Sequence, residues 1–259
     1  MIIIKSPREI DIMRKAGGAL SEATARIREE VAEGMTTGDL DSIALEELKK
    51  RGLAPAFLNY GYPPSPASIC ASINDEIVHG IPSNKRVLET GDILSVDIGG
   101  ILEGFNVDMA FTVTVGPADK AAEKLLRVTR EALEAGVGKM YTSLRLGDVS
   151  SAIQEVAEAE NYSIVRELVG HGIGRDLHEA PNVPNYGVKG RGLILETGLV
   201  LAIEPMLIEG DNPSIKYADD EWTVKSVSGR NAAHFENTVA VTEKGPLMIT
   251  EFLWEKESE

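Results

Sequence analysis

The sequence predicts an α+β fold built from two similar halves. Helix-like and strand-like segments follow one another as helix, helix, strands, and the same order then repeats. The stretch LETGDILSVD at residues 88–97 also recurs as LETGLVLAIE at residues 195–204, at an offset of 107 residues. We therefore expect one domain spanning residues 1–259, with pseudo-symmetric halves at about 1–116 and 117–250. Each half should contain two helices and an antiparallel sheet segment.

The first helix is expected to begin with a capping box. SPRE at residues 6–9 has the required pattern, with proline at the first helical position, and Gly34 is expected to end this helix. The other helices are expected at residues 39–51, 119–135 and 148–160. Short β-rich runs such as IVHG, ILSVD and FTVTV are typical of strands, and the final FLWEKESE is expected to fray.

Two further features recur between the halves. Gly38-Asp39 and Gly147-Asp148 each stand at the expected start of a helix, at an offset of 109 residues. His79 and His178 each begin a His-x-x-Pro pattern, at an offset of 99 residues. The short histidine match could arise by chance, but the ten-residue match with helices in register favours a duplication.

Composition limits the classes of partner. The chain is 43% hydrophobic, carries a formal net charge of −15 and has a pI of about 4.8. Nucleic acids and anionic membranes require a basic surface, so we expect neither as a partner. Cys70 is the only cysteine, which excludes an internal disulfide and is typical of a reducing compartment. The apolar start MIII is too short for a signal peptide, so we expect a cytoplasmic protein.

Acidic residues stand at the ends of apolar runs in both halves. Asp97 ends ILSVD, and a tight turn at residues 101–104 would place Asp97 directly opposite Asp108 in a hairpin. Taken alone, Asp97 is more simply a strand end that leaves the core. However, Glu204 occupies the position of Asp97 in the repeat, and Glu236 begins another strand. Four converging carboxylates would repel one another, and two divalent cations would neutralise them.

Histidines add a second type of donor. The chain has four of them: His79, His171, His178 and His234. His171 lies in VGHGIG, a small-residue segment that another group can approach closely. A single histidine in such a loop is more often a hydrogen-bonding residue than a ligand. Combined with four carboxylates, one imidazole gives an oxygen-rich set that suits Mn, Fe, Co or Zn.

Five residues in this order form a signature: Asp97, Asp108, His171, Glu204 and Glu236. With KSPREIDIMRKAGG, VDIGG, VGHGIG, AIEPM and HFENT, the chain resembles the bacterial type I methionine aminopeptidases over essentially its whole length. The resemblance implies the pita-bread fold shared with proline-specific peptidases, with a metal site at the seam between the halves. It also implies removal of N-terminal methionine from nascent proteins and peptides whose second residue is small.

The resemblance further implies two divalent metal ions, which could be Co, Mn, Fe or Zn. Asp97, Asp108 and Glu236 would hold one ion. The other would be held by Asp108, His171, Glu204 and Glu236. A water between the ions would be the nucleophile, and Glu204 would transfer its proton.

The remaining site residues are also implied by the resemblance. His178 would hydrogen-bond the scissile carbonyl oxygen, and His79 would contact the substrate near the scissile bond. No role is assigned to His234. The residues expected to form the methionine pocket are Tyr62, Cys70, His79, Leu177, His178 and Trp222.

Some positions depart from the family pattern or have a simpler explanation. Asn59 and Ser65 stand where relatives often carry Cys or an aromatic residue, so the sequence does not determine which residues form the walls of the pocket. Met109-Ala110 follows Asp108 where many relatives carry a small hydroxyl residue. A buried free cysteine such as Cys70 is usually only a small hydrophobe, and Trp222 could be a packing residue of its hairpin.

Alternative functions are left open at this point. A proline-specific dimetal aminopeptidase or dipeptidase usually carries a separate N-terminal domain, and because a capping box already begins at Ser6 we do not expect one here. A non-catalytic binding protein of the same fold is a second alternative, and docking on the ribosome is a third. The expected partners are nascent polypeptide N-termini, with transient ribosome contact, and the expected state is a monomer.

Overall fold

A nine-stranded, mainly antiparallel sheet runs through the centre of the molecule in the computed structural model, which describes residues 1–253. The strand order is β1–β4–β5–β14–β9–β7–β8, with β2 beside β4 and β15 beside β14. These strands are β1 (Ala54–Pro55), β2 (Ile69–Ile73), β4 (Ile93–Leu102), β5 (Phe105–Thr114), β7 (Gly170–Gly172), β8 (Glu179–Val183), β9 (Val200–Ile203), β14 (Glu236–Thr242) and β15 (Gly245–Met248).

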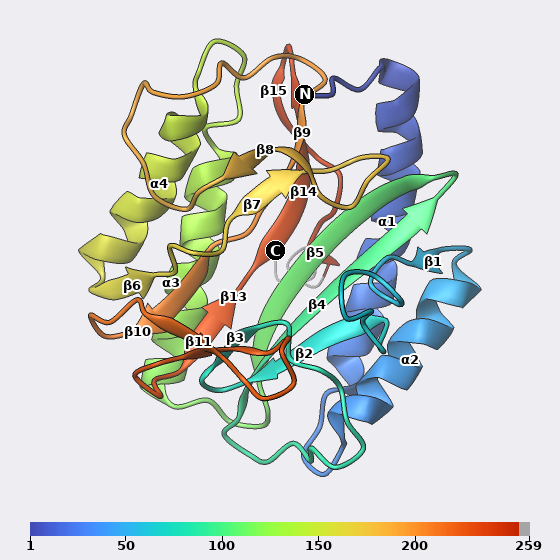
Figure 1. The fold of residues 1–259 in the computed structure, drawn as a ribbon, viewed down its shortest axis with the longest axis vertical. Helices are drawn as coiled ribbons and strands as arrows, with labels where there is room; N and C mark the ends of the chain where they lie inside the picture. Colours follow the sequence, from blue (N-terminus) through green and yellow to red (C-terminus); the bar gives the residue numbers. More distant parts are fainter. Residues whose placement is uncertain (254–259) are drawn as a thin grey trace.

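Two pairs of helices flank this sheet, one pair on each side in Figure 1. They are α1 (Pro7–Glu30) with α2 (Thr37–Lys50), and α3 (Lys120–Val137) with α4 (Leu146–Ala159). Two smaller sheets complete the described part of the chain. One has the order β13 (Ala232–His234), β10 (Met206–Glu209) and β6 (Tyr162–Ile164), and the other has the order β11 (Ile215–Tyr217), β12 (Val224–Ser226) and β3 (Glu76–Val78).

Local capping explains where the helices begin. Ser6 and Glu9 form the predicted capping box at the start of α1. α2 and α4 each begin two residues earlier than expected, because the acid that was expected to open the helix lies inside its first turn. Asp39 accepts a hydrogen bond from the backbone N–H of Thr36, and Asp148 accepts one from that of Arg145.

The first helix ends at Glu30, four residues before the predicted stop at Gly34. Gly34 lies in a turn with a φ of 85°, and its N–H donates to the carbonyl of Leu88. The glycine therefore belongs to the connection between helix and sheet rather than to the helix end.

The two halves match in detail. β4 and β9 each begin five residues after the leucine of their LETG sequence. An isolated bridge joins Thr36 to Val87 in the first half, and an equivalent bridge joins Arg145 to Ile194 in the second. The halves meet where β5 pairs with β14. The predicted α+β architecture of two pseudo-symmetric halves is confirmed, while the division near residue 116 stays a prediction.

The β4–β5 hairpin has a different register from the predicted one. Its turn is Glu103-Gly104, and both residues have positive φ, 50° and 78°, as a type I′ turn requires. Consequently Asp97 pairs with Ala110, and Asp108 pairs with Gly99. The expectation that the two aspartates lie directly opposite each other is wrong. They are diagonal neighbours on one face of the hairpin, and β4 continues well past Asp97.

The core extends to the last described residues. Phe252, within the sequence expected to fray, is 8% exposed and packs edge-on against Phe235 with ring centroids 5.8 Å apart. The expectation of a frayed end is therefore wrong at Phe252, and residues 254–259 lie outside the described part. Among the described residues, the structure has no helix long and apolar enough to cross a membrane.

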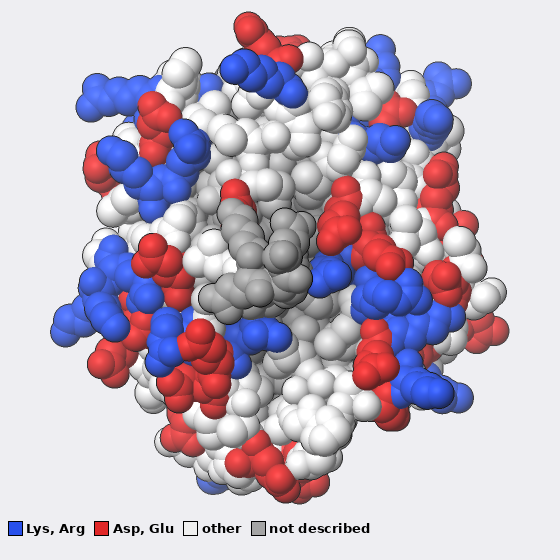
Figure 2. Space-filling view, turned by 180° about the vertical axis from the view of Figure 1, so that it is seen from behind, with Lys and Arg blue, Asp and Glu red and all other residues white. Residues whose placement is uncertain are grey.

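Charged side chains of both signs are interspersed along the flanks of the molecule, as Figure 2 shows for the face opposite to that of Figure 1. On α1, Arg26 forms ion pairs with Glu29 and Glu30. On α3, Arg127 pairs with Glu131 at 2.8 Å. These basic side chains are thus engaged with acids of their own helix.

Candidate metal centre

The sheet register aligns two acids and a thiol across four strands. Cys70 of β2 pairs with Asp97 of β4, which pairs with Ala110 of β5, which pairs with Glu236 of β14. Side chains of directly paired residues point to the same side of a sheet. The small Ala110 side chain therefore lies between the two carboxylates and leaves space beside them.

The other predicted ligands join this face from both sides of the seam. Asp108 lies two residues before Ala110 on β5 and so points the same way. His171 of β7 pairs with Ala202 of β9, and Glu204 lies two residues beyond Ala202, just past the end of that strand. The halves thus contribute their acids to one place, as the repeat predicted.

All of the predicted ligands line one cavity of about 130 Å³. One ligand atom from each of Asp108, His171 and Glu236 lies within 4.8 Å of the other two. The same holds for Asp97, His234 and Glu236. The Nε2 atom of His171 also lies 3.6 Å from Oε1 of Glu204. The described residues therefore include two overlapping groups of possible metal ligands.

Three buried carboxylates of this cavity each have one oxygen without a hydrogen-bond partner among the described residues. Asp97, Asp108 and Glu236 are 9%, 3% and 2% exposed. One oxygen of each, Oδ1 in the aspartates and Oε1 in Glu236, accepts no hydrogen bond from the described residues. Burying an ionised carboxylate without a partner is strongly unfavourable. These orphaned oxygens are what a bound cation would satisfy.

The acidity of the carboxyls follows from the same burial. Burial, and then the charges of neighbouring acids, raise the pKa of Asp97, Glu204 and Glu236 well above the usual range. Burial raises the pKa of Asp108 to about 7. Without a cation, the cluster therefore retains protons at a pH at which isolated carboxyls have lost them.

His171 is arranged as a neutral ligand. Burial, and then the neighbouring His178, lower the pKa of His171 to about 4. Its Nδ1 lies 2.8 Å from the carbonyl oxygen of Gly172, so that nitrogen donates a hydrogen bond and Nε2 is left as the acceptor. This is the arrangement that metal-binding histidines usually have. The carboxylate oxygens together with the imidazole fit a divalent ion.

Two other histidines face the same cavity. The hydroxyl of Tyr60 lies 2.6 Å from Nδ1 of His178, whose ring packs edge-on against His171 with centroids 4.2 Å apart. His79 has a left-handed backbone with a φ of 61°, and its ring lies edge-on to Trp222. Holding a non-glycine residue in the left-handed backbone region costs about 1–3 kcal/mol of conformational free energy, and such strained residues are concentrated at functional sites.

The expected pocket residues lie together with one exception. Cys70, His79, Leu177, His178 and Trp222 line the cavity. Tyr62 does not, because its side chain is 98% exposed.

Tyr60, two residues before Tyr62, lines the cavity instead, together with Phe57 and Ser65. Between the two tyrosines, Gly61 has a φ of 79° and lies against Trp222, where an added Cβ would come within 2.6 Å of the indole. The chain turns at this glycine, which separates the directions of the two side chains.

The backbone of Asp108 has a hydroxyl partner despite the Met109-Ala110 sequence that follows it. The backbone N–H of Asp108 donates to Oγ1 of Thr238 at 2.9 Å, and the same hydroxyl donates to the Asp108 carbonyl at 2.8 Å. Thr238 lies on β14, so the hydroxyl comes from across the seam and not from the adjoining residue.

His234 is a site residue that the sequence did not identify. It is 1% exposed, and its Nε2 lies 3.6 Å from Oε2 of Glu236 and 3.7 Å from Oε2 of Glu204. Burial lowers its pKa to about 3, so its imidazole is neutral. The signal available in the sequence was the His-x-Glu spacing, which places two side chains on one face of an extended chain.

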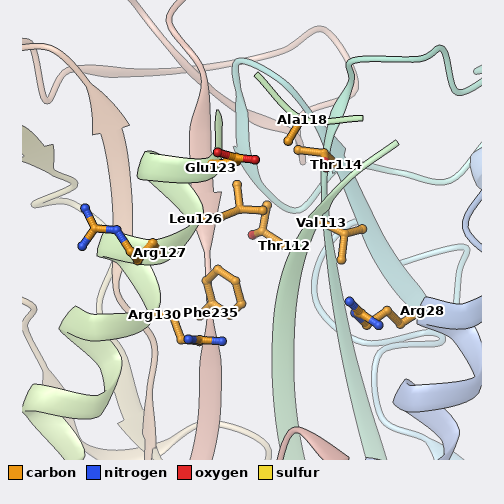
Figure 3. Close-up of a pocket in the computed structure, with 10 residues that line it drawn as sticks. All are labelled: Arg28, Thr112, Val113, Thr114, Ala118, Glu123, Leu126, Arg127, Arg130 and Phe235. Carbon is orange, nitrogen blue, oxygen red and sulfur yellow. The ribbon is translucent and has the colours of Figure 1, made fainter. Parts of the chain in front are cut away.

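A larger cavity of about 380 Å³ lies elsewhere, between α1, α3 and β5 (Figure 3). It is lined by Arg28, Thr112, Val113, Thr114, Ala118, Glu123, Leu126, Arg127, Arg130 and Phe235. None of the predicted site residues is among them, so volume alone does not locate the chemistry.

The chain matches a known family over most of its length. Residues 11–243 match the model of Metallopeptidase family M24. The chain belongs to metallopeptidase family M24. This M24 chain is 47% identical over 251 residues to a methionine aminopeptidase of Clostridium perfringens (strain 13 / Type A), covering 96% of this chain and 99% of that relative.

Solved structures agree with the family assignment. The crystal structure of methionine aminopeptidase from Thermotoga maritima matches with a TM-score of 0.93 at 43% identity, covering 97% of this chain and 100% of that one. The prolidase from Pyrococcus furiosus matches with a TM-score of 0.76 at 22% identity, covering 96% of this chain and 65% of that one, and shares the fold alone. The M24 chain has the pita-bread fold and is a metal-dependent aminopeptidase that groups with the methionine aminopeptidases.

Proposed function

We propose that this M24 enzyme removes N-terminal methionine from peptides and nascent proteins whose second residue is small. The observation that carries the proposal is a buried cluster of carboxylates and imidazoles that opens into a small cavity with apolar walls. The relatives named methionine aminopeptidase support the same substrate. The partners are then nascent polypeptide N-termini, which the enzyme binds in the cytoplasm during transient contact with the ribosome. The single cysteine of the chain is consistent with that reducing compartment.

Two divalent ions, Co, Mn, Fe or Zn, are the proposed cofactors. Asp97, Asp108 and Glu236 would hold one of them. The second would be held by Asp108, His171, Glu204 and Glu236. When bound, such ions lower the pKa of a water molecule and polarise a carbonyl group.

Glu204 is the proposed proton carrier. It accepts a proton from the attacking water and returns one to the leaving amine. Its side chain is 13% exposed and lies between the two imidazoles of His171 and His234. Its backbone carbonyl accepts a hydrogen bond from the side-chain amide of Asn185 at 2.9 Å, which fixes the chain just beyond β9.

His178 is the proposed donor to the scissile carbonyl oxygen. When the Tyr60 hydroxyl donates to Nδ1 of His178, the ring proton stays on Nε2. That N–H can then donate to an oxygen on which negative charge develops. Burial lowers the pKa of His178, so the ring is neutral and carries one N–H proton, which can be on either Nδ1 or Nε2. His79, held in its strained backbone conformation beside Trp222, contacts the substrate near the same bond.

The cavity suits one unbranched apolar side chain. Its walls include Phe57, Cys70, Leu177 and Trp222, and its volume of about 130 Å³ is below the roughly 300–1,000 Å³ typical of drug-sized ligands. Burial raises the pKa of the Cys70 thiol, so this side chain contributes a neutral, polarisable surface. A flexible thioether packs well against aromatic rings and sulfur.

Release of the first residue from two tripeptides tests the proposal. Chelated enzyme is given Met-Ala-Ser or Ala-Pro-Ala, with and without added Co, Mn, Fe or Zn. We expect metal-dependent release of methionine from the first peptide and no cleavage of the second. A preference for Ala-Pro-Ala would instead indicate a proline-specific peptidase. No turnover of either peptide by protein that binds the ions would indicate a non-catalytic binding protein.

A further inference from the structure

The backbone of His234 is held so that its ring must enter the metal centre. His234 is the last residue of β13 and pairs with Met206 of β10. Its N–H donates to Oγ1 of Thr112 at 3.0 Å, and the same hydroxyl donates to its carbonyl at 2.7 Å. Hydrogen bonds on both sides of the residue therefore fix the direction of the side chain, and the ring is almost completely buried.

The surroundings of the ring fit those of a metal ligand. Nε2 lies 3.6 Å from a Glu236 oxygen and 3.7 Å from a Glu204 oxygen, which is too long for good hydrogen bonds. Neither ring nitrogen has a hydrogen-bond partner among the described residues. Two ligands of one ion, with bonds of about 2.1 Å, lie roughly 3–4.3 Å apart. The observed distances fall in this range.

The grouping of the ligand atoms assigns the ring to one of the two ions. Asp97, His234 and Glu236 form one compact trio, and Asp108, His171 and Glu236 form the other. We propose that His234 is a protein ligand of the ion held by Asp97 and Glu236, so that each ion of the pair receives one imidazole. This inference rests on the two-ion centre of the proposed function and adds a sixth ligand to the five that the resemblance implies.

The imidazole nitrogen of His234 changes which metal ions the site at Asp97 and Glu236 prefers. A site of carboxylates alone favours hard ions such as Mn, whereas imidazole favours Zn, Co and Fe. We therefore expect the two sites to resemble each other in cobalt affinity, and the ion at Asp97 to be retained at lower free metal than carboxylates alone would allow. A ring that only donated a hydrogen bond to Glu204 or Glu236 would have neither effect.

The first test uses the wild-type chain. Chelated protein labelled with ¹⁵N-histidine is loaded with cobalt(II), which is paramagnetic. NMR then detects the ring N–H resonance of each histidine that is bonded to cobalt, because the bond shifts that resonance strongly. Two such resonances are expected, one of which disappears in His171→Asn and the other in His234→Asn. A single resonance, lost in His171→Asn, would overturn the proposal.

Cobalt binding to His234→Gln is the second test, measured by equilibrium dialysis. Glutamine retains a polar side chain that can hydrogen-bond the carboxylates. We expect one of the two dissociation constants to rise at least about 10–100-fold while the other stays unchanged. His79→Ala is the matched control, because His79 lies outside both trios, and it should keep both affinities.

The outcomes separate this inference from the proposed function. Unchanged cobalt affinities in folded His234→Gln would overturn the ligand role even if the enzyme releases methionine. Two metal-bonded histidines in a protein that releases no methionine would uphold the ligand role and overturn the function. If His234→Gln does not fold, the wild-type resonances decide the question alone.

Discussion

Asp97 and Glu236 lie on either side of one residue, Ala110, on three neighbouring strands. The two acids come from different halves of the chain, and the residue of β5 that pairs with both of them carries only a methyl group. Their separation is therefore set by the spacing of the sheet, which is rigid. The space for ions depends on the small size of Ala110.

Ala110→Val tests this dependence. Two extra methyl groups in a fully buried position should reduce metal affinity at least about 10-fold and lower stability by about 1–3 kcal/mol. Calorimetric titration of chelated protein with Mn²⁺ measures the first effect. Met109→Leu, on the adjacent residue whose side chain faces the other way, is the control and should bind normally. Normal affinity in Ala110→Val would show that the ions do not occupy this space.

Stability of the chelated protein should fall as the pH rises above about 6.5. Burial raises the pKa of Asp108 to about 7 and also raises those of Asp97, Glu204 and Glu236. A carboxyl with a raised pKa in the folded state binds more protons there than in the unfolded chain, where the value is about 4. The stability that it contributes is complete below about pH 4 and is lost as the pH rises toward about 7. The buried neutral histidines have the opposite effect up to about pH 6.5, where histidine loses its proton in the unfolded chain, so the net fall is expected above that pH.

Thermal unfolding with chelator or with Mn²⁺, from about pH 6.5 to 8, measures this effect. The melting temperature of the chelated protein should decrease along this range, and Asp108→Asn should flatten the decrease. Added metal should stabilise the protein most at the alkaline end, because protons compete with the ion for the same oxygens. Higher stability of the chelated protein at about pH 8 than at about pH 6.5 would contradict the description of the cluster.

Tyr60→Phe should slow the reaction without affecting metal binding. The variant keeps the ring in the cavity wall and removes only the hydroxyl 2.6 Å from His178. Losing one hydrogen bond of about 1–1.5 kcal/mol corresponds to a decrease of about 5–15-fold in kcat/KM. Tyr62→Phe is the matched control, because that side chain is 98% exposed, and it should be unchanged. Equal rates in the two variants would remove Tyr60 from the mechanism.

A buried ion pair connects the N-terminal segment to the segment that carries His178. Nζ of Lys5 lies 2.5 Å from Oε2 of Glu179, and both side chains are 2% exposed. Lys5→Met should lower the free energy of unfolding by about 3–5 kcal/mol, because Glu179 then lacks its partner. Urea unfolding measures this, and Lys5→Met/Glu179→Leu should recover most of the loss. A single variant as stable as the wild type would contradict the prediction.

The sequence predicted the helices well because their signals are local. The capping signals at Ser6 and Asp119 act within one turn, and the repeated LETG sequences mark equivalent strands. The hairpin register was missed because a type I′ turn depends on which two residues adopt positive φ. Glycine at the second position made Glu103-Gly104 the better pair, and that choice moved Asp97 away from Asp108.

The sequence predicted the site residues that belong to a motif. It did not predict those whose place in the site depends on the direction in which the folded backbone points the side chain. All five predicted ligands line one cavity. The resemblance implied Tyr62 for the pocket, whereas Tyr60 lines it, and the effect of Gly61 on side-chain direction is not visible in the sequence. His234 was passed over because its position depends on β10 and Thr112, which are distant in sequence. Such long-range contacts require the folded chain.

The most direct test of the account is methionine release from Met-Ala-Ser as metal is returned to chelated enzyme. The account predicts no release without metal, and activity that rises with bound Co, Mn, Fe or Zn. Glu204→Gln, loaded to the same occupancy, should lose activity at least about 100-fold because it cannot carry the proton. Methionine release that persists in full after chelation would contradict the central claim that this cluster of acids works by holding metal ions.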